Sequence, residues 1–272
     1  MNISPEVAAE IARIIAGTAS VRTGIQAKGV AVPPTAQIDA LSTYIAQISG
    51  GAPAPPSVGL FIKAMNASGF PTQLEFRGTT IPTSYFNAVF FRQTQEIDLI
   101  GNVSIISQLA FAENAGLISL DLPQSLTSLR DRAMDGCTGL AYTELNLPNA
   151  TVESRSFQSL TAMRTLKAKI KQLGASSSAN SDSFYRCTGL RYVWISEAIT
   201  TRIYGSASAY PFLQCNAALK IYTDVASDAN RPANWSEHWN RISASDLAET
   251  HYGVSEAQFE SIVNAAYGET IY

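Results

Sequence analysis

The chain has 272 residues, of which 46% are hydrophobic and only 15% are charged, and its net charge is −3. The hydrophobic share is large enough to fill a core, which excludes disorder over most of the chain. The low, slightly negative charge excludes the basic surface that nucleic acids and anionic membranes attract, so neither is expected as a partner. No stretch has the roughly 18 consecutive apolar residues of a membrane span.

Residues 1–50 predict two helices that form an attachment or oligomerisation segment. Ser4 and Pro5 are placed to begin the first helix, and its charged residues predict an amphipathic helix rather than a secretory leader. In the second helix, apolar residues alternate steps of three and four, at Ile38, Leu41, Ile45 and Ile48. Two short helices bury too little surface to be stable alone. We therefore expect a homo-oligomer or a partner subunit; the alternative is that they cover the end of the domain that follows.

Residues 51–69 predict a semi-rigid linker. Glycine and proline fill its beginning, from Gly50 to Pro56. Proline removes backbone donors and glycine adds conformational freedom, so neither a helix nor a sheet is expected there.

An internal repeat organises residues 70–225. A large apolar residue recurs at intervals from 23 residues (Phe111 to Met134) to 28 residues (Phe184 to Phe212). This period lies in or near the range of leucine-rich repeats, about 20 to 29 residues. Alternating apolar residues follow each of these positions and predict strands that stack as a parallel ladder, among them Leu74, Ile97, Leu120, Leu145, Leu166, Val193 and Ile221. About six or seven coils are expected.

The three cysteines occupy one position of this repeat, three residues after the large apolar residue. They are Cys137, Cys187 and Cys215. An odd number at wide spacing argues against a disulfide framework and against a zinc site. At this position a free cysteine is expected to point inward as a compact hydrophobic side chain.

The run AMDGCTGL from Ala133 to Leu140, with the LNLP that begins at Leu145, resembles the BspA-like class of bacterial leucine-rich repeats. The resemblance covers residues 70–225, with insertions after Leu140 and around Ser176 that depart from the pattern. The resemblance implies that the fold is a short irregular leucine-rich-repeat solenoid. Members of this class are similar to surface adhesins, so it also implies a function in binding rather than catalysis. With helical segments at both ends, the predicted fold class is α+β.

A second resemblance concerns the segment KGVAVP from Lys28 to Pro33 and the helical seam after it. This segment looks like the short helical module that opens many tail and other virion proteins of bacteriophages. The resemblance implies assembly with other virion proteins or with copies of the chain itself. It also explains how an adhesive repeat reaches the outside of a cell without a leader, because lysis releases virions.

Residues 226–272 predict a cap over the end of the solenoid. Ser255 is a good N-cap for a last helix that reaches about Ala266, with Phe259, Ile262 and Val263 on its apolar face. A solenoid end exposes its core unless something covers it. The helix is therefore expected over that end, after Trp235 and Trp239.

No catalytic residue, metal site or cofactor is predicted. His238 and His251 are the only histidines, and neither has a third ligand or a plausible nucleophile beside it. Phosphate-binding glycine motifs and the nucleophile elbow are missing. A glycosidase would need an acid and a carboxylate facing each other across a cleft, and no such pair is recognisable. We therefore expect a protein that is not an enzyme.

Alternation along the strands also predicts which side chains point outward. Acidic residues gather on the early rungs, and basic and aromatic residues on the later ones. An exposed aromatic cluster with flanking lysines is predicted as the binding site: Tyr192, Trp194 and Tyr222 with Lys167, Lys169 and Lys220. Flat rings with polar edges suit sugar rings or protein anchors. The alternative is that the N-terminal segment, a loop or a neighbouring subunit covers the cluster.

Together these features predict a non-enzymatic bacteriophage virion protein of the tail, baseplate or fibre. Its solenoid would recognise a host-surface glycan or protein, and it would be extracellular after release. The alternative is a bacterial leucine-rich-repeat adhesin that is secreted or displayed on the cell surface.

Overall fold

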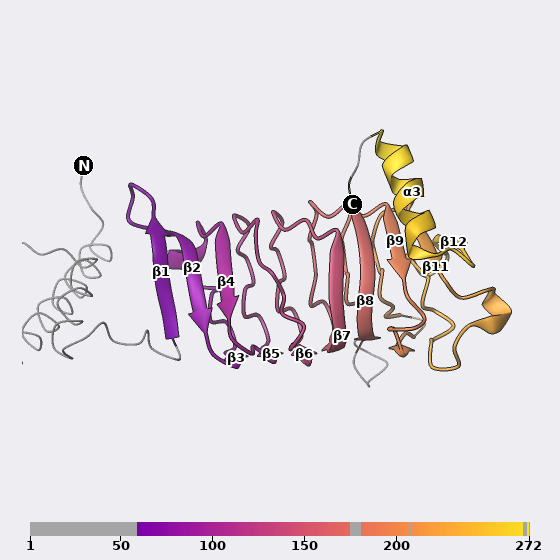
Figure 1. The fold of residues 1–272 in the computed structure, drawn as a ribbon, viewed down its shortest axis with the longest axis horizontal. Helices are drawn as coiled ribbons and strands as arrows, with labels where there is room; N and C mark the ends of the chain where they lie inside the picture. Colours follow the sequence, from indigo (N-terminus) through magenta and orange to yellow (C-terminus); the bar gives the residue numbers. More distant parts are fainter. Residues whose placement is uncertain (1–58, 175–180, 207, 269–270, 272) are drawn as a thin grey trace, which may run out of the picture. The chain divides into compact units, whose positions relative to one another are not determined.

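The computed structural model of the chain describes residues 59–174, 181–206, 208–268 and 271. The predicted N-terminal segment, 1–50, lies outside these residues, and with it Ile38, Leu41, Ile45 and Ile48. The described residues form a three-stranded sheet, a nine-stranded sheet and the helix α3 (Figure 1).

The strands follow one another along the molecule in chain order (Figure 1). The smaller sheet contains β1 (Gly59–Met65), β2 (Pro71–Arg77) and β4 (Glu96–Ile100). The larger sheet contains β3 (Thr80–Ile81), β5 (Ile105–Ile106), β6 (Ser128–Leu129), β7 (Glu144–Val152), β8 (Thr165–Leu173), β9 (Tyr192–Ile195), β10 (Arg202–Ile203), β11 (Lys220–Thr223) and β12 (Glu249–His251). The 3-10 helices η1 (Val89–Phe91) and η2 (Asp228–Asn230) lie in connections, and α3 spans Glu256–Tyr267.

Strand β1 begins inside the stretch predicted as a linker. It pairs antiparallel with β2, with Leu60 opposite Phe76 and Ile62 opposite Leu74. The linker predicted for residues 51–69 therefore does not extend through Gly59–Met65. The reason is local, because the apolar run Gly59-Leu60-Phe61-Ile62 follows the last proline of the row and provides side chains that a sheet can bury.

The predicted parallel ladder is confirmed. Leu166 pairs with Val193, and Val193 pairs with Ile221 on the next rung. A bridge from Glu96 to Ser119 joins β4 to the following coil. The result is a parallel β-solenoid of about six turns.

Each coil also contributes to a second parallel ladder, which the sequence reading missed. Its rungs are β3, β5, β6, the ends of β7 and β8, and β10, with pairs of buried apolar residues: Ile81 with Ile106, Ile106 with Leu129, Leu129 with Val152, and Leu173 with Val152 and Ile203. Most of these strands have two residues, so they are too short to show an alternating pattern.

Where neighbouring repeats both have phenylalanine as the large apolar residue, the two rings stack from coil to coil. The ring centroids are 4.9 Å apart for Phe86 and Phe111, 5.1 Å for Phe157 and Phe184, and 5.5 Å for Phe184 and Phe212. All of these rings are fully buried. Stacked rings add to the stability that comes from burying their area.

The turns that carry these rings use left-handed backbone at residues other than glycine. Two such positions flank Phe111, at Leu109 and Glu113 with φ of 56° and 63°, and two flank Phe157, at Arg155 and Ser159; the coils of Phe86, Phe184 and Phe212 have one each. This conformation costs roughly 1–2 kcal/mol per residue. Hydrogen bonds to the next coil help offset the cost, for example from Phe111 N to Ala133 O at 2.8 Å.

Helix α3 begins and ends nearly as predicted, but it packs in a different place. Ser255 caps it in a reciprocal capping box with Gln258, and the helix ends at Gly268, whose φ is 69°. Instead of covering the end of the solenoid, it lies beside β9 and β11 (Figure 1). The buried Trp235 and Trp239, from the segment before β12, complete the core at that end.

Candidate binding surface

The outward side chains of the first ladder, from β2 and β4 of the smaller sheet and from β7, β8, β9 and β11 of the larger one, make up what we call the sheet face. Strand pairing places Glu75 beside Asp98, Glu144 beside Lys167, and Tyr192 beside Lys220. Adjacent strands lie about 4.8 Å apart, so these side chains stand in rows across the coils. The early rungs are acidic and the later ones basic and aromatic, as predicted.

The early part of the face, the open half, is exposed or half-buried and mostly polar, with Ile100 as an exposed apolar residue at the end of β4. Its polar residues include Gln73, Glu75, Glu96, Asp98, Ser119, Asp121 and Asn146. Lys63 from β1 donates to Asp98 at 2.6 Å, and Gln73 donates to Glu96 at 3.0 Å. Asp121 forms no ion pair with any described residue, so its carboxylate is available to a ligand.

The later part of the face, the covered half, lies under α3. Trp194 and Tyr222 are each only 4% exposed, because Phe259 and Val263 of α3 pack on them. Trp194 Nε1 also donates to the carbonyl of Val254 at 2.8 Å, just before the helix. The expectation of an exposed aromatic cluster is therefore wrong.

What covers the cluster is the chain's own C-terminal helix. The alternatives considered from sequence were the N-terminal segment, a loop or a neighbouring subunit. Helix α3 was missed because it was expected at the solenoid end. Of the other predicted binding residues, Tyr192 is half-buried, and Lys220 pairs with Glu249 at 3.0 Å near the rim of the face.

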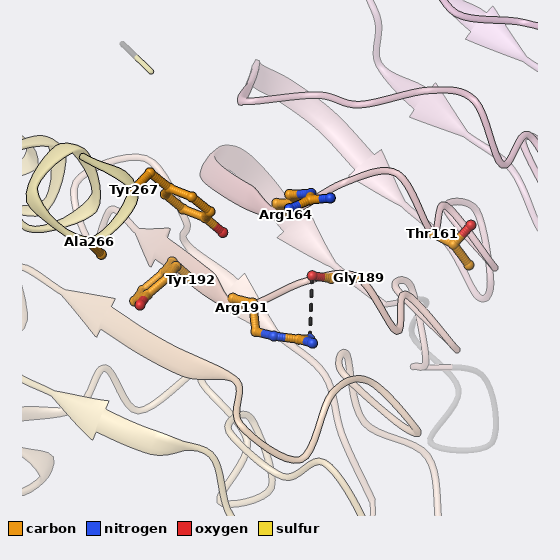
Figure 2. A pocket seen from close by; sticks show the side chains of 7 residues that line it. All are labelled: Thr161, Arg164, Gly189, Arg191, Tyr192, Ala266 and Tyr267. Carbon is orange, nitrogen blue, oxygen red and sulfur yellow. Dashed lines mark hydrogen bonds between the residues drawn. The ribbon is translucent and has the colours of Figure 1, made fainter. Parts of the chain in front are cut away.

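A hollow of about 420 Å³ opens where the last turn of α3 meets the edge of the sheet face (Figure 2). Its lining residues are Thr161, Arg164, Gly189, Arg191, Tyr192, Ala266 and Tyr267, and we call it the arginine pocket. A second hollow of about 370 Å³ shares Arg164 and Tyr267 with it and continues toward Tyr142. Neither was predicted, because each combines coil residues with residues from the C-terminal end of the chain.

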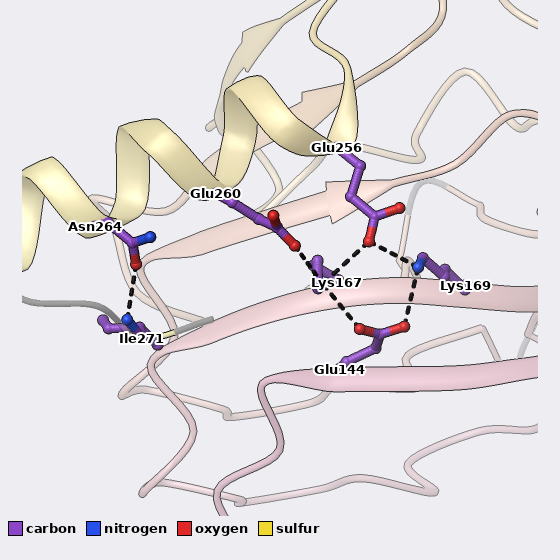
Figure 3. A network of polar contacts seen from close by, with 7 residues as sticks. All are labelled: Glu144, Lys167, Lys169, Glu256, Glu260, Asn264 and Ile271. Atoms are coloured by element: carbon purple, nitrogen blue, oxygen red, sulfur yellow. Dashed lines mark hydrogen bonds and ion pairs between the residues drawn. The ribbon is translucent and has the colours of Figure 1, made fainter.

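Two lysines of the sheet face are held by carboxylates from α3 and β7 (Figure 3). Lys167 Nζ lies 2.8 Å from Glu144, 3.0 Å from Glu256 and 2.6 Å from Glu260. The side chain of Lys167 is only 7% exposed. Lys169 Nζ lies 3.0 Å from Glu144 and 2.7 Å from Glu256. Both lysines, predicted to flank a ligand site, instead attach the helix to the sheet.

These ion pairs shift the pKa values of the groups involved. Burial opposes the charge on Lys167, but hydrogen bonds with the three glutamates outweigh it and raise its pKa. Burial raises the pKa of Glu144 and of Glu256, but hydrogen bonds with Lys167 and Lys169 outweigh it and lower both values. All of these groups are charged at neutral pH, so the network holds α3 in place and provides no poised acid or base.

The cysteines occupy the structural position that the repeat predicts. Each thiol donates to the carbonyl of the ring-bearing residue one coil earlier: Cys137 to Phe111 at 3.1 Å, Cys187 to Phe157 at 3.0 Å, and Cys215 to Phe184 at 3.0 Å. Asn114 makes the same contact to Phe86 at 2.8 Å. Burial raises the pKa of Cys137 to about 12, so this thiol is not a nucleophile at neutral pH.

Among the described residues, no group of three or more histidine, cysteine, aspartate or glutamate side chains could hold a metal ion. His251 stacks on Tyr222, with ring centroids 4.5 Å apart, and His238 lies 3.3 Å from Glu237. In the same part of the chain, no helix is long and apolar enough to span a membrane. That the chain is not an enzyme stays a prediction.

Comparison with known proteins agrees with the architecture. Residues 79–218 match the family model of the BspA type leucine rich repeat region, in six copies. Neither a curated protein nor a solved structure matches the chain. The matched residues do not include Lys28–Pro33, so the resemblance of that segment to bacteriophage modules stays a prediction.

Proposed function

Because the chain belongs to the BspA-type leucine-rich repeat family, we propose that it is a non-enzymatic, adhesin-like binding protein. Proteins with these repeats are typically secreted or displayed on a surface. The proposed ligand is a glycan or a protein on a cell surface, and the proposed binding site is the open half of the sheet face.

The observation that carries this proposal is the row of outward carboxylates on a rigid ladder. Glu75 pairs in register with Asp98, and the bridge from Glu96 to Ser119 puts Asp98 and Asp121 in the same phase on neighbouring rungs. Glu75 and Asp98 lie on paired strands and Asp121 follows the bridge at Ser119, so the backbone holds the row in place before a ligand arrives, which lowers the entropic cost of binding. The row suits a ligand that presents amines or hydroxyl groups.

The test is a binding assay of the full-length chain on glycan arrays and on bacterial and host cell surfaces. The double variant Asp98→Lys/Asp121→Lys reverses the charge of the row, and we expect roughly a tenfold or greater loss of binding, as for removal of charge-assisted hydrogen bonds. The matched control is Glu237→Lys, because Glu237 lies outside both ladders and its side chain is 76% exposed. If the double variant and the control bind equally well, the open half is not the binding site.

The bacteriophage setting is a finer proposal about where this protein works. Its support is the resemblance of Lys28–Pro33 and the apolar seam after it, which also predicts a homo-oligomer. Native mass spectrometry of the full-length chain tests it, with Leu41→Asp and Ile45→Asp expected to convert a multimer to a monomer. A wild-type chain that is monomeric would count against the virion role and leave the surface adhesin.

A further inference from the structure

The arginine pocket has the size of a small-ligand site, and its lining residues differ from those of the open half. Its volume of about 420 Å³ falls in the range of ligand pockets, about 300–1,000 Å³. Figure 2 shows its side chains arranged around the hollow, from three separate segments: the turn at Thr161–Arg164, the turn at Gly189–Tyr192, and the last turn of α3.

The two arginines occupy equivalent positions on adjacent coils. The backbone N–H groups of Arg191 and Tyr192 both donate to the carbonyl of Arg164, at 2.8 and 3.3 Å. Neither guanidinium forms an ion pair with a carboxylate of the described residues, whereas Lys167 and Lys169 are bound by glutamates from two elements. Like charges on neighbouring strands repel each other, so an anion placed between the two arginines would relieve this repulsion.

The backbone fixes one of the two arginines. Arg191 Nη1 donates to the carbonyl of Thr188 at 3.1 Å and to that of Gly189 at 3.5 Å, the second of which is drawn in Figure 2. Gly189 is required there, because a Cβ would lie 2.1 Å from the carbonyl oxygen of Thr161. This leaves the other guanidinium nitrogens of Arg191 for a ligand, in a position that needs little reordering on binding.

Two tyrosines form the wall opposite the arginines. The rings of Tyr192 and Tyr267 lie 6.0 Å apart at 73°. Burial raises the pKa of Tyr267, as does Tyr192, while the charges of Arg164 and Arg191 act to lower it. A flat apolar ring with a polar edge suits a sugar, whose ring has apolar C–H faces and hydroxyl groups on its rim.

We propose that the arginine pocket binds the carboxylate of an acidic sugar, and that the adjoining hollow holds the next sugar of the same glycan. A guanidinium matches the two oxygens of a carboxylate in a bidentate pair. The adjoining hollow shares Arg164 and Tyr267 and adds the exposed Thr143 with the apolar side chains of Ala141, Ala162 and Ile271, which suits a neutral neighbour. This inference rests on the proposed binding function, to which it gives a ligand class and a second site.

The test is isothermal titration calorimetry of the full-length chain with a galacturonate tetrasaccharide and with sialyllactose. Maltotetraose is the neutral comparison and inorganic phosphate the anionic one. Arg164→Gln and Arg191→Gln are each expected to weaken binding of the acidic sugar roughly ten- to a hundredfold, the effect of losing a charged hydrogen bond. Arg164→Lys and Arg191→Lys keep the charge and lose the bidentate pair, so an intermediate loss of affinity is expected. These lysine variants also test the proposal in case a glutamine variant does not fold.

The matched control is Arg202→Gln. Arg202 has a tyrosine nearby, with its guanidinium 5.4 Å from the ring centroid of Tyr204, but it lies on β10 and outside the pocket. Its substitution is expected to leave sugar binding unchanged. Failure of both acidic sugars to bind, binding that survives the Arg164 and Arg191 substitutions, or equal binding of maltotetraose or phosphate would each overturn the proposal.

The two binding proposals fail separately. If Asp98→Lys/Asp121→Lys loses cell-surface binding but keeps the affinity for galacturonate, both sites stand. If that double variant keeps cell-surface binding and the pocket variants lose it, the open half is wrong and the arginine pocket stands. If cell-surface binding is lost only in the double variant and no acidic sugar binds, the pocket proposal alone is overturned.

Discussion

The open and covered halves of the sheet face are built by the same repeat, yet one meets solvent and the other a helix. The difference lies in what the outward rows contain. Carboxylates and amides on the early rungs are stable in water, whereas a large apolar surface such as that of Trp194 and Tyr222 is rarely left exposed. The chain therefore supplies its own partner for the covered half.

Helix α3 shows in detail what the covered half binds. Phe259 and Val263 meet the aromatic rings, while Glu256 and Glu260 meet the lysines. The helix therefore places apolar groups on the aromatic rings and carboxylates on the lysines, as in a protein interface with a buried anchor and a polar rim. The comparison teaches that an outward row predicts the chemistry of its partner but not whether that partner belongs to the same chain.

The largest expected effect is that of Trp194→Ala in the covered half. Removing a buried tryptophan leaves a cavity and costs about 3–5 kcal/mol of unfolding free energy. It also removes the hydrogen bond to Val254 that helps to seat α3. Urea denaturation followed by circular dichroism measures the loss. An unfolding free energy within experimental error of wild type would show that α3 does not pack on Trp194 in solution.

A smaller effect is expected for Lys167→Met, which keeps the length of the side chain but removes its charge. Three carboxylates then lose a shared cation, which we expect to cost roughly 1–3 kcal/mol, because the glutamates remain partly in solvent and a fully buried pair would cost more. Lys220→Met is the matched control, since the Lys220 side chain is 38% exposed and, within the described part of the chain, its ion pair is with Glu249. Equal melting temperatures for the two variants would contradict a structural role of the network.

The same network predicts how stability depends on pH. The lowered pKa values of Glu144 and Glu256 give stability that is present above the ordinary carboxyl pKa of 4.5 and is lost as pH falls through the lowered values. The raised pKa of Lys167 gives stability that is complete below 10.5 and is lost as pH rises through the raised value. In urea titrations, the difference between wild type and Lys167→Met should therefore shrink in acid; a constant difference down to pH 2 would refute the assignment.

Sequence predicted the features of this fold that repeat. The spacing of Phe111, Met134, Phe157 and Phe184 located the coils, and alternation placed Leu166 and Val193 inward on adjoining rungs, as the structure confirms. The capping residue of α3 was also predicted, because a helix cap depends only on a few neighbouring residues.

Contacts between distant parts of the chain could not be predicted in this way. Trp194 and Val254 are far apart in sequence, and no local pattern joins them. The second ladder was missed because a two-residue strand such as Ile105–Ile106 has no periodicity, although its apolar residues recur at nearly the same interval as the aromatic ones. The tight approach at Gly189 had a signal in the repeated Thr-Gly-Leu, which also occurs at Gly139, where a Cβ would lie 2.8 Å from the carbonyl oxygen of Leu117.

The smallest effect on stability is expected for Asp121→Asn in the open half. Asp121 is exposed and forms no ion pair with the described residues, so the unfolding free energy should change by less than about 0.5 kcal/mol. If the open half is the ligand surface, the same substitution weakens cell-surface binding, because the carboxylate meets its partner only in the complex. Glu237→Asn provides the control for a carboxylate outside the face. A loss of stability in Asp121→Asn comparable to that of Lys167→Met would mean that the open half is also covered in solution. The two halves would then differ in what covers them and not in whether they are exposed.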